Sequence, residues 1–125
     1  MVWKDILKMP VSFDAEQQRD VNWKQKIIDY EKKEIEPVFN EFIQSQGPEH
    51  RFKELGIGFN NKPEDTENMP KAAGVTQQDY RIGNNTVNEL GGNRKFILNT
   101  LAEIYKQEGW DVENHSTHIL IKNKR

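Results

Sequence analysis

The hydrophobic residues near the end of the chain follow a helical spacing. Over residues 93–108 the apolar side chains recur every three or four positions, which places them on one face of an α-helix. These apolar residues are Ile97, Leu98, Leu101, Ile104 and Tyr105. Asn93 is a suitable N-cap, and Gly109 stands where a left-handed residue would end the helix. The pattern therefore predicts a helix with defined start and stop signals.

The residues after this helix alternate between apolar and polar, which indicates strands. Trp110 and Val112 alternate with acidic residues, and an apolar run follows the polar turn at 114–116. A period of two is typical of a strand with one buried face. We therefore expect a β-hairpin with strands at about 110–114 and 118–122, against which the rest of the chain packs.

The first part of the chain has helical patterns separated by polar residues. The spacing predicts a short amphipathic helix over 2–9 and a polar connector over 11–20. Residues 21–46 place apolar side chains on one face and Glu and Lys on the other, as in a long surface helix. Because Pro37 lacks a backbone donor and its ring clashes with the preceding turn, we expect a kink or a break near Glu36.

The middle of the chain has less regular patterns. Apolar residues alternate with glycine over 55–59, which indicates a strand with one apolar face and one bare face that another group can approach closely. Residues 60–78 are mostly polar and predict a flexible loop. A second short strand at 80–82 can pair with the first, and a capping-box pattern predicts a short helix over 87–90.

Together these elements predict an α+β fold in a single domain spanning 1–125. The N-terminal helices and the central helix would pack on a small antiparallel sheet that includes the C-terminal hairpin. Only 34% of the residues are hydrophobic and the mean hydropathy is −0.92, so the core must be small. We therefore expect that a protein partner or a second copy of the chain covers part of the surface.

The composition excludes several classes of protein. A net charge of −2 excludes a strongly basic nucleic-acid binder but allows a local basic patch. The absence of cysteine excludes disulfide scaffolds, zinc ribbons and thiol catalysis. No apolar run approaches 18 residues, and the first residues lack the pattern of a signal peptide, so we expect a cytoplasmic protein without membrane contact.

The turn before the central helix is a candidate anion site. Glycines before a helix N-terminus leave backbone N–H groups that can hold an anion, and two cations follow them here. The alternative is an ordinary turn between helices with two solvated cations. With the basic residues near the end of the chain, the candidate surface for an anion or a nucleic acid comprises Gly92, Asn93, Arg94, Lys95, His118, Lys122, Lys124 and Arg125.

Two histidines in the hairpin turn have the chemistry of metal ligands. His115 and His118 lie near Asp111 and Glu113. Their spacing of three does not place them on one face of a strand, where side chains alternate with a period of two. They are weak candidates, and we predict no metal, no cofactor and no catalytic residue.

The first residues resemble a group of known sequences. Trp3-Lys4-Asp5-Ile6-Leu7-Lys8 resembles the opening of small, uncharacterised phage and marine-metagenome proteins. The resemblance implies a phage origin, with the host cytoplasm or the virion as the location, and it implies no activity. From its physical properties, the segment either packs Trp3 against the rest of the protein or is a peptide that binds a partner.

A second, partial resemblance covers residues 97–121. The order of helix, Gly-aromatic pair, strand, Ser-x-His and apolar strand is similar to that of HicA-type mRNA interferase toxins. The residues that carry it are Leu101, Gly109, Trp110, Val112, Ser116, His118 and Ile119. The resemblance implies a double-stranded-RNA-binding-like fold, with His118 in the position of the catalytic histidine.

The sequence leaves two main function classes open. The first is a non-enzymatic protein-interaction or structural module, because no recognisable catalytic motif is present. The alternative is a small RNA- or DNA-binding protein that uses the helix and hairpin at 93–122 with the basic tail. This alternative requires its cations to lie on one face. A metal-dependent hydrolase that uses His115 and His118 is a third interpretation.

Overall fold

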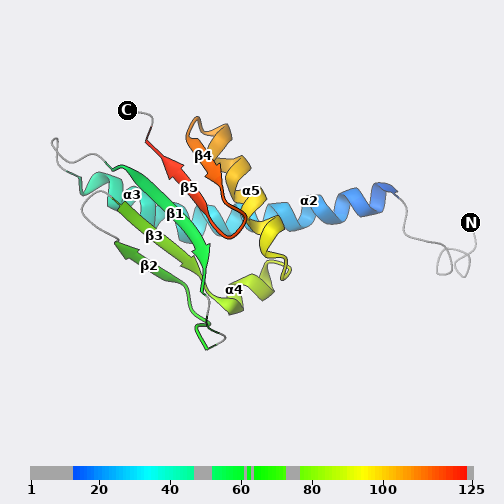
Figure 1. Cartoon of the computed structure of the whole chain (residues 1–125). Coiled ribbons are helices and arrows are strands. Elements are labelled where there is room, and N and C mark those ends of the chain that lie inside the picture. Colours follow the sequence, from blue (N-terminus) through cyan, green and yellow to red (C-terminus); the bar gives the residue numbers. More distant parts are fainter. Residues whose placement is uncertain (1–12, 47–51, 61, 63, 73–76, 124–125) are drawn as a thin grey trace, which may run out of the picture.

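The computed structural model describes residues 13–46, 52–60, 62, 64–72 and 77–123 (Figure 1). In chain order its elements are α2 (Phe13–Tyr30), the π-helical turn η1 (Glu31–Ile35), α3 (Glu36–Gln44), β1 (Glu54–Phe59), β2 (Met69–Ala72), β3 (Gln77–Ile82), α4 (Asn84–Glu89), α5 (Arg94–Gln107), β4 (Asp111–Asn114) and β5 (Ile119–Lys122). The helix expected over 2–9, the proposed docking of Trp3, and the basic residues Lys124 and Arg125 lie outside the described residues.

The five strands form one mixed sheet in the order β2-β3-β1-β5-β4. β1 and β3 are parallel, from Glu54 opposite Gln77 to Phe59 opposite Ile82. The other neighbouring pairs are antiparallel, including the hairpin β4–β5. The α+β class and the C-terminal hairpin are confirmed. The sheet is not wholly antiparallel as expected, because β2 turns the chain back so that β3 runs in the same direction as β1.

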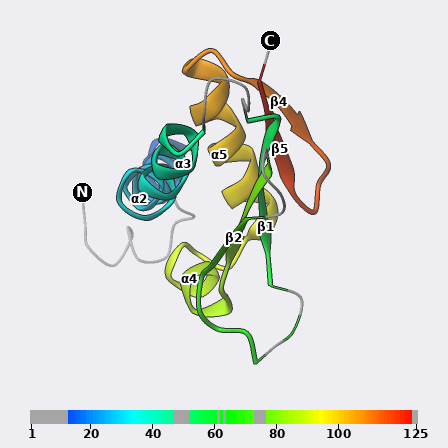
Figure 2. The same cartoon turned by 90° about the vertical axis from the view of Figure 1, so that its left-hand side faces the viewer.

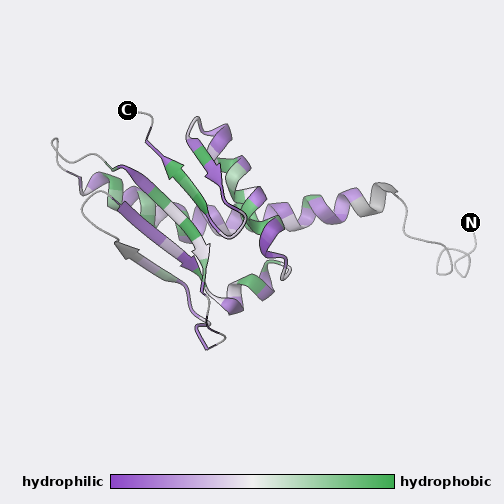
Figure 3. Ribbon diagram, viewed as in Figure 1, coloured by the Kyte–Doolittle hydropathy of each residue, from purple (hydrophilic) through white to green (hydrophobic). Residues whose placement is uncertain are grey.

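All described helices lie on one side of the sheet, so the molecule has a helical layer and a sheet layer (Figure 2). Side chains that alternate along β1, β3 and β5 point into this helical layer. The fully buried side chains between the layers are Ile27, Ile35, Leu55, Ile57, Ile82, Ile97, Leu98, Leu101, Ile119 and Ile121. The hydropathy colouring in Figure 3 agrees with this distribution of buried residues. β5 is mostly hydrophobic, whereas β3 and the part of α2 that extends beyond the sheet are mostly hydrophilic.

The first described helix starts earlier than the sequence pattern predicts. α2 begins at Phe13, so the expectation of a polar connector over 11–20 is wrong for its described part. This part of α2 extends beyond the sheet (Figure 1), and residues 17–22 are exposed. It contains no Pro or Gly, and Gln18 donates a 3.0 Å hydrogen bond to Asn22 one turn later. Helix propensity and local pairs therefore maintain residues 17–22, whose side chains are exposed in the described part of the chain.

Pro37 explains the irregular turn between α2 and α3. In η1 the Glu36 N–H donates to the carbonyl of Glu31, five residues earlier. A proline has no N–H to offer, and its ring pushes away the carbonyl four positions before it. The wider π-helical turn accommodates both effects without ending the helix. The expected irregularity near Glu36 is thus a π-helical turn, with Pro37 in the first turn of α3.

The central helix agrees closely with its sequence signals. The Asn93 side chain accepts a 3.0 Å hydrogen bond from the Phe96 N–H and so caps α5. Gly109 has a φ of 93°, the left-handed conformation expected of the residue that stops the helix. The short helix expected over 87–90 is present as α4, but it begins at Asn84.

Residues 60–78 do not form one loop. They contain β2 and the start of β3, which the polar composition concealed. Asn60 is only 3% exposed, and its side-chain amide donates a 2.9 Å hydrogen bond to the Glu67 carbonyl. A Cβ at Gly83 would lie 2.2 Å from the Thr66 carbonyl oxygen. Only glycine at position 83, just before α4, therefore lets the backbone around Thr66 pass so close to it. Backbone contacts rather than apolar burial therefore order the described part of this segment.

Candidate functional site on the open face of the sheet

The side of the sheet opposite the helices is uncovered in the described part of the chain (Figure 2). Because the apolar residues of β1 point toward the helices, Gly56 and Gly58 face the open side. In the parallel register with β3, Gly56 lies opposite Asp79 and Gly58 lies opposite Arg81. The centre of this face therefore has no side chains on β1, with charged side chains beside it on β3.

The two glycines form the floor of a trough with a volume of about 380 Å³. Asp79 and Arg81 border it on the β3 side, and Thr117, His118 and Leu120 border it on the β5 side. The bordering side chains are half-buried or exposed, so the trough is open to solvent. Small-molecule sites are usually enclosed and mainly apolar. A shallow, polar trough is better suited to the side chains of a larger partner.

The position of the Asp79 carboxyl group depends on glycine at position 56. A Cβ at Gly56 would lie 2.8 Å from Asp79 Oδ1, so this oxygen occupies the space above the strand. A Cβ at Gly58 would lie 3.4 Å from the Cβ of His118, which is an ordinary contact. Among the side chains that the structure describes, which do not include Lys71 opposite Asp79, the side chains of Asp79 and Arg81 have no hydrogen-bond or ion-pair partner. Within this set, an acid and a base therefore border the trough without an internal partner.

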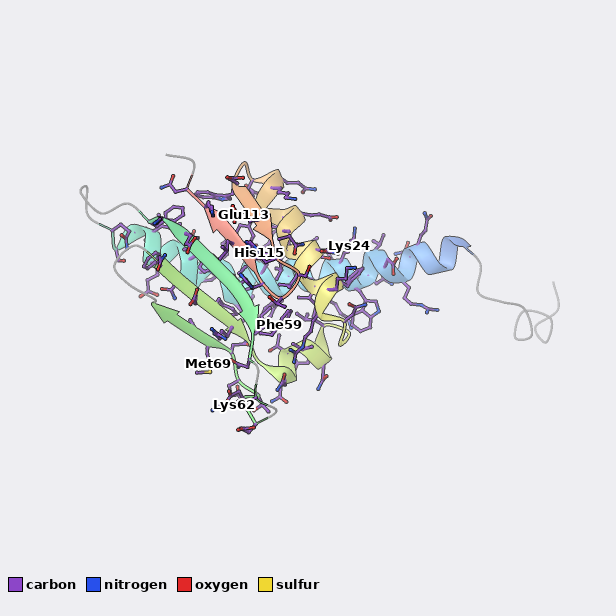
Figure 4. The ribbon with its side chains drawn as sticks, viewed as in Figure 1. Lys24, Phe59, Lys62, Met69, Glu113 and His115 are labelled. Atoms are coloured by element: carbon purple, nitrogen blue, oxygen red, sulfur yellow. The ribbon has the colours of Figure 1, made fainter. Side chains whose placement is uncertain are left out.

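The hairpin beside the trough holds a paired group of charges. Oε2 of Glu113 forms an ion pair with Lys122 Nζ at 2.9 Å. Oε1 of Glu113 lies 3.1 Å from Nε2 of His115, which is its neighbour in Figure 4. Hydrogen bonds from Lys122 and His115 lower the pKa of Glu113, and the same bond to Glu113 raises the pKa of Lys122. Glu113, Lys122 and His115 therefore have partners within the hairpin itself.

The two candidate metal ligands of the hairpin turn, His115 and His118, lie side by side with their rings face to face. The rings of His115 and His118 are stacked, with centroids 4.9 Å apart and planes at 16°. Stacking brings ring faces together, whereas a shared metal needs ring nitrogens to converge. Nδ1 of His118 lies 3.0 Å from the Thr117 hydroxyl oxygen. Among residues 13–46, 52–60, 62, 64–72 and 77–123, no group of three or more potential ligands could hold a metal ion.

The residues at the start of α5 are separated from the trough. Asn93 uses its side chain as the helix cap. The guanidinium of Arg94 lies 5.1 Å from the ring centroid of Phe59, and it donates a 3.0 Å hydrogen bond to the Asn84 side chain. Gly92 has a φ of 75° and follows α4, and Lys95 is exposed.

The predicted nucleic-acid surface is not assembled on one face by the described residues. Arg94 contacts the helix-facing ring of Phe59 at the C-terminal end of β1. Lys122 lies opposite Glu54 at the N-terminal end of the same strand, on the open face. His118 is near the middle of that face. The cations expected to act together are thus divided between two ends and two sides of the sheet.

Sequence reasoning missed Asp79 and Arg81 as site residues. The available signal was the pair Gly56 and Gly58, which indicates a bare strand face that another group can approach. The expected pairing of a strand at 80–82 with the strand at 55–59 is confirmed, but the sequence did not show that the two strands run parallel or that this strand starts before Asp79. Without the parallel pairing of β1 and β3, nothing connects these charges with the glycines.

Comparisons of the chain with protein-family models, with curated proteins and with solved structures give no significant match. None of the described helices is long and apolar enough to cross a membrane.

Proposed function

We propose that this protein is a non-enzymatic interaction module that binds a protein partner through the open face of its sheet. The observation that carries the proposal is the glycine-floored trough on the uncovered face, bordered by Asp79 and Arg81, which have no partner among the described side chains. An exposed face with an acid and a base in reach can contact a peptide segment by hydrogen bonds and ion pairs. The proposal retains the first function class expected from the sequence.

The charges of the open face favour a protein partner over a nucleic acid. The register places four acidic residues on this face, Glu54, Asp79, Asp111 and Glu113, and three residues with permanently cationic side chains, Lys71, Arg81 and Lys122. Nucleic-acid binding depends on a positive surface that replaces the counterions of the phosphates. A face with four acidic residues and three permanent cations lacks the excess of positive charge that binding to a phosphate backbone requires.

The edges of the sheet are less suitable for a partner than its face. β2 at one edge contains Pro70, which cannot donate a backbone hydrogen bond to an added strand. β4 at the other edge carries Asp111 and Glu113, and charged side chains discourage strand addition. We therefore assign the interaction to the face of the sheet.

The test uses peptides displayed as a random library and selected against the immobilised protein. Gly58→Trp would fill the trough, and Lys33→Trp adds the same bulk to an exposed position in the helical layer. We expect selected peptides to bind the wild type and the Lys33→Trp variant alike, and to bind Gly58→Trp at least about tenfold more weakly, which corresponds to about 1.4 kcal/mol. Thermal melting checks that both variants fold.

Three outcomes would contradict the proposal. The first is a selection in which no peptide distinguishes Gly58→Trp from Lys33→Trp. The second is salt-dependent binding of a short RNA or DNA that Gly58→Trp abolishes, which would assign the face to nucleic acid. The third is a dimer in sedimentation experiments that Gly58→Trp dissociates, which would assign the face to a second copy of the chain.

A further inference from the structure

We propose that the trough accepts an extended peptide segment in which a basic and an acidic residue are two positions apart. The basic side chain would contact Asp79, and the acidic side chain would contact Arg81. This inference rests on the proposed function and specifies the chemistry of the partner.

The spacing of the two charges matches that of an extended chain. Asp79 and Arg81 are two residues apart on β3 and point to the same face. Their Cα atoms are therefore about 6.6–6.8 Å apart along the strand. An extended segment that lies along the trough has the same repeat, so its residues i and i+2 can meet both charges. Because the two charges have opposite signs, the segment must carry one base and one acid.

Other charges near the trough already have partners within the protein. Glu113 is paired with Lys122 and His115. Glu54 accepts a 3.0 Å hydrogen bond from the side-chain amide of Gln77. Among the side chains that the structure describes, Asp79 and Arg81 have no such partner, so none of these described side chains competes with an incoming segment for the two charges; the side chain of Lys71, opposite Asp79 on β2, is not one of those described.

The surroundings of the two charges favour a close approach. Gly56 and Gly58 present no side chain, so a backbone can come near the sheet. Leu120, across the trough from Asp79, offers an apolar contact to the methylene groups of a Lys or Arg side chain. Met69, directly opposite Arg81 on β2, is 47% exposed and extends the apolar contact beside the acid-binding position.

The test uses four nine-residue, threonine-rich peptides measured by fluorescence anisotropy. Two have Lys-Thr-Glu or Glu-Thr-Lys at their centre, and two controls have Lys-Thr-Lys or Glu-Thr-Glu. We expect one of the two mixed peptides to bind at least about fivefold more tightly than either control, since an exposed ion pair contributes up to about 1 kcal/mol. The preferred order of Lys and Glu reports the direction in which the segment lies.

A charge exchange in the protein makes the test specific. In Asp79→Arg combined with Arg81→Asp, the preference between Lys-Thr-Glu and Glu-Thr-Lys should invert. The matched control combines Lys33→Asp with Glu41→Arg, two exposed residues of the helical layer, and should leave the preference unchanged. Thermal melting of both double variants checks that the fold is retained.

Failure of this inference can be distinguished from failure of the proposed function. Equal binding of mixed and control peptides, no binding of either mixed peptide, or a preference that the charge exchange leaves intact would overturn the inference. If peptides from the random library still lose affinity for Gly58→Trp, the interaction face stands and only its charge specificity is wrong. If no library peptide responds to Gly58→Trp, both proposals fail.

Discussion

The Tyr105 hydroxyl donates a 2.7 Å hydrogen bond to the Glu31 carboxyl group and thereby joins α5 to the π-helical turn η1. Glu31 is only 3% exposed, so its carboxyl group has lost nearly all contact with water. Burial raises its pKa above the ordinary value of 4.5, the hydrogen bond from Tyr105 opposes this shift, and the nearby Glu36 carboxyl adds to it. The folded protein therefore binds the proton of Glu31 more tightly than the unfolded chain does.

Replacement of Glu31 by Gln should change how stability depends on pH. Because the folded protein binds this proton more tightly than the unfolded chain, the contribution of Glu31 to stability is fully present below about pH 4.5 and is lost as pH rises through its raised folded pKa. Gln remains neutral and can still accept from Tyr105. We expect Glu31→Gln to gain stability relative to the wild type as pH rises from 4.5 toward 8, measured by urea denaturation.

A control for this prediction is Glu41→Gln, because Glu41 is exposed on α3. It should leave the pH dependence of unfolding nearly unchanged. An equal response of both variants to pH would show that the effect comes from net charge and not from burial of Glu31.

Replacement of Tyr105 by Phe should destabilise the protein by about 1–3 kcal/mol, the cost of leaving a buried polar group without its partner. The ring would keep its contact with Phe39, whose centroid is 6.2 Å away, so the loss reports mainly the hydroxyl. In a double-mutant cycle with Glu31→Leu, which removes the acceptor, the loss should be smaller than in the wild-type background. Additive effects of the two substitutions would argue against their coupling.

The two glycines of β1 should respond differently to alanine. Gly58→Ala meets only an ordinary contact with His118, and alanine in a strand is favoured over glycine by about 0.5–1 kcal/mol, so this variant should be slightly more stable. Gly56→Ala must displace the Asp79 carboxyl group and should gain less. If the trough functions as proposed, Gly56→Ala should also weaken peptides that depend on Asp79. Urea denaturation and anisotropy measure the two effects, and a larger stability gain at position 56 would contradict the geometry.

The glycines between α4 and α5 should also differ. Gly91 and Gly92 have φ values of 103° and 75°, so alanine at either position should cost about 1–2 kcal/mol from the left-handed conformation alone. Only at Gly91 would the new Cβ also meet the Trp23 ring, at 3.3 Å, whereas the space at Gly92 is open. We expect Gly91→Ala to lower the melting temperature more than Gly92→Ala. Equal losses would mean that Trp23 does not rest on Gly91 in solution.

Local signals in the sequence were sufficient for α5 and the hairpin that follows it. Asn93 and Gly109 mark the ends of the helix, and the alternation around Val112 and Ile119 marks the strands, because capping and side-chain periodicity depend only on residues close in the chain. The same kind of signal misplaced the start of α2. The side chains of residues 17–22 are exposed, so hydrophobic periodicity could not reveal this part of the helix.

The sequence by itself determined the α+β class, the amphipathic helices, the hairpin and the bare glycine face of β1. Only the tertiary structure decided that β3 pairs in parallel with β1, that Glu31 is buried against Tyr105, and that Asp79 and Arg81 border the glycines. Each of these relationships joins residues far apart in the chain. Such pairings depend on the combined packing of all layers, and no spacing within a single segment encodes them.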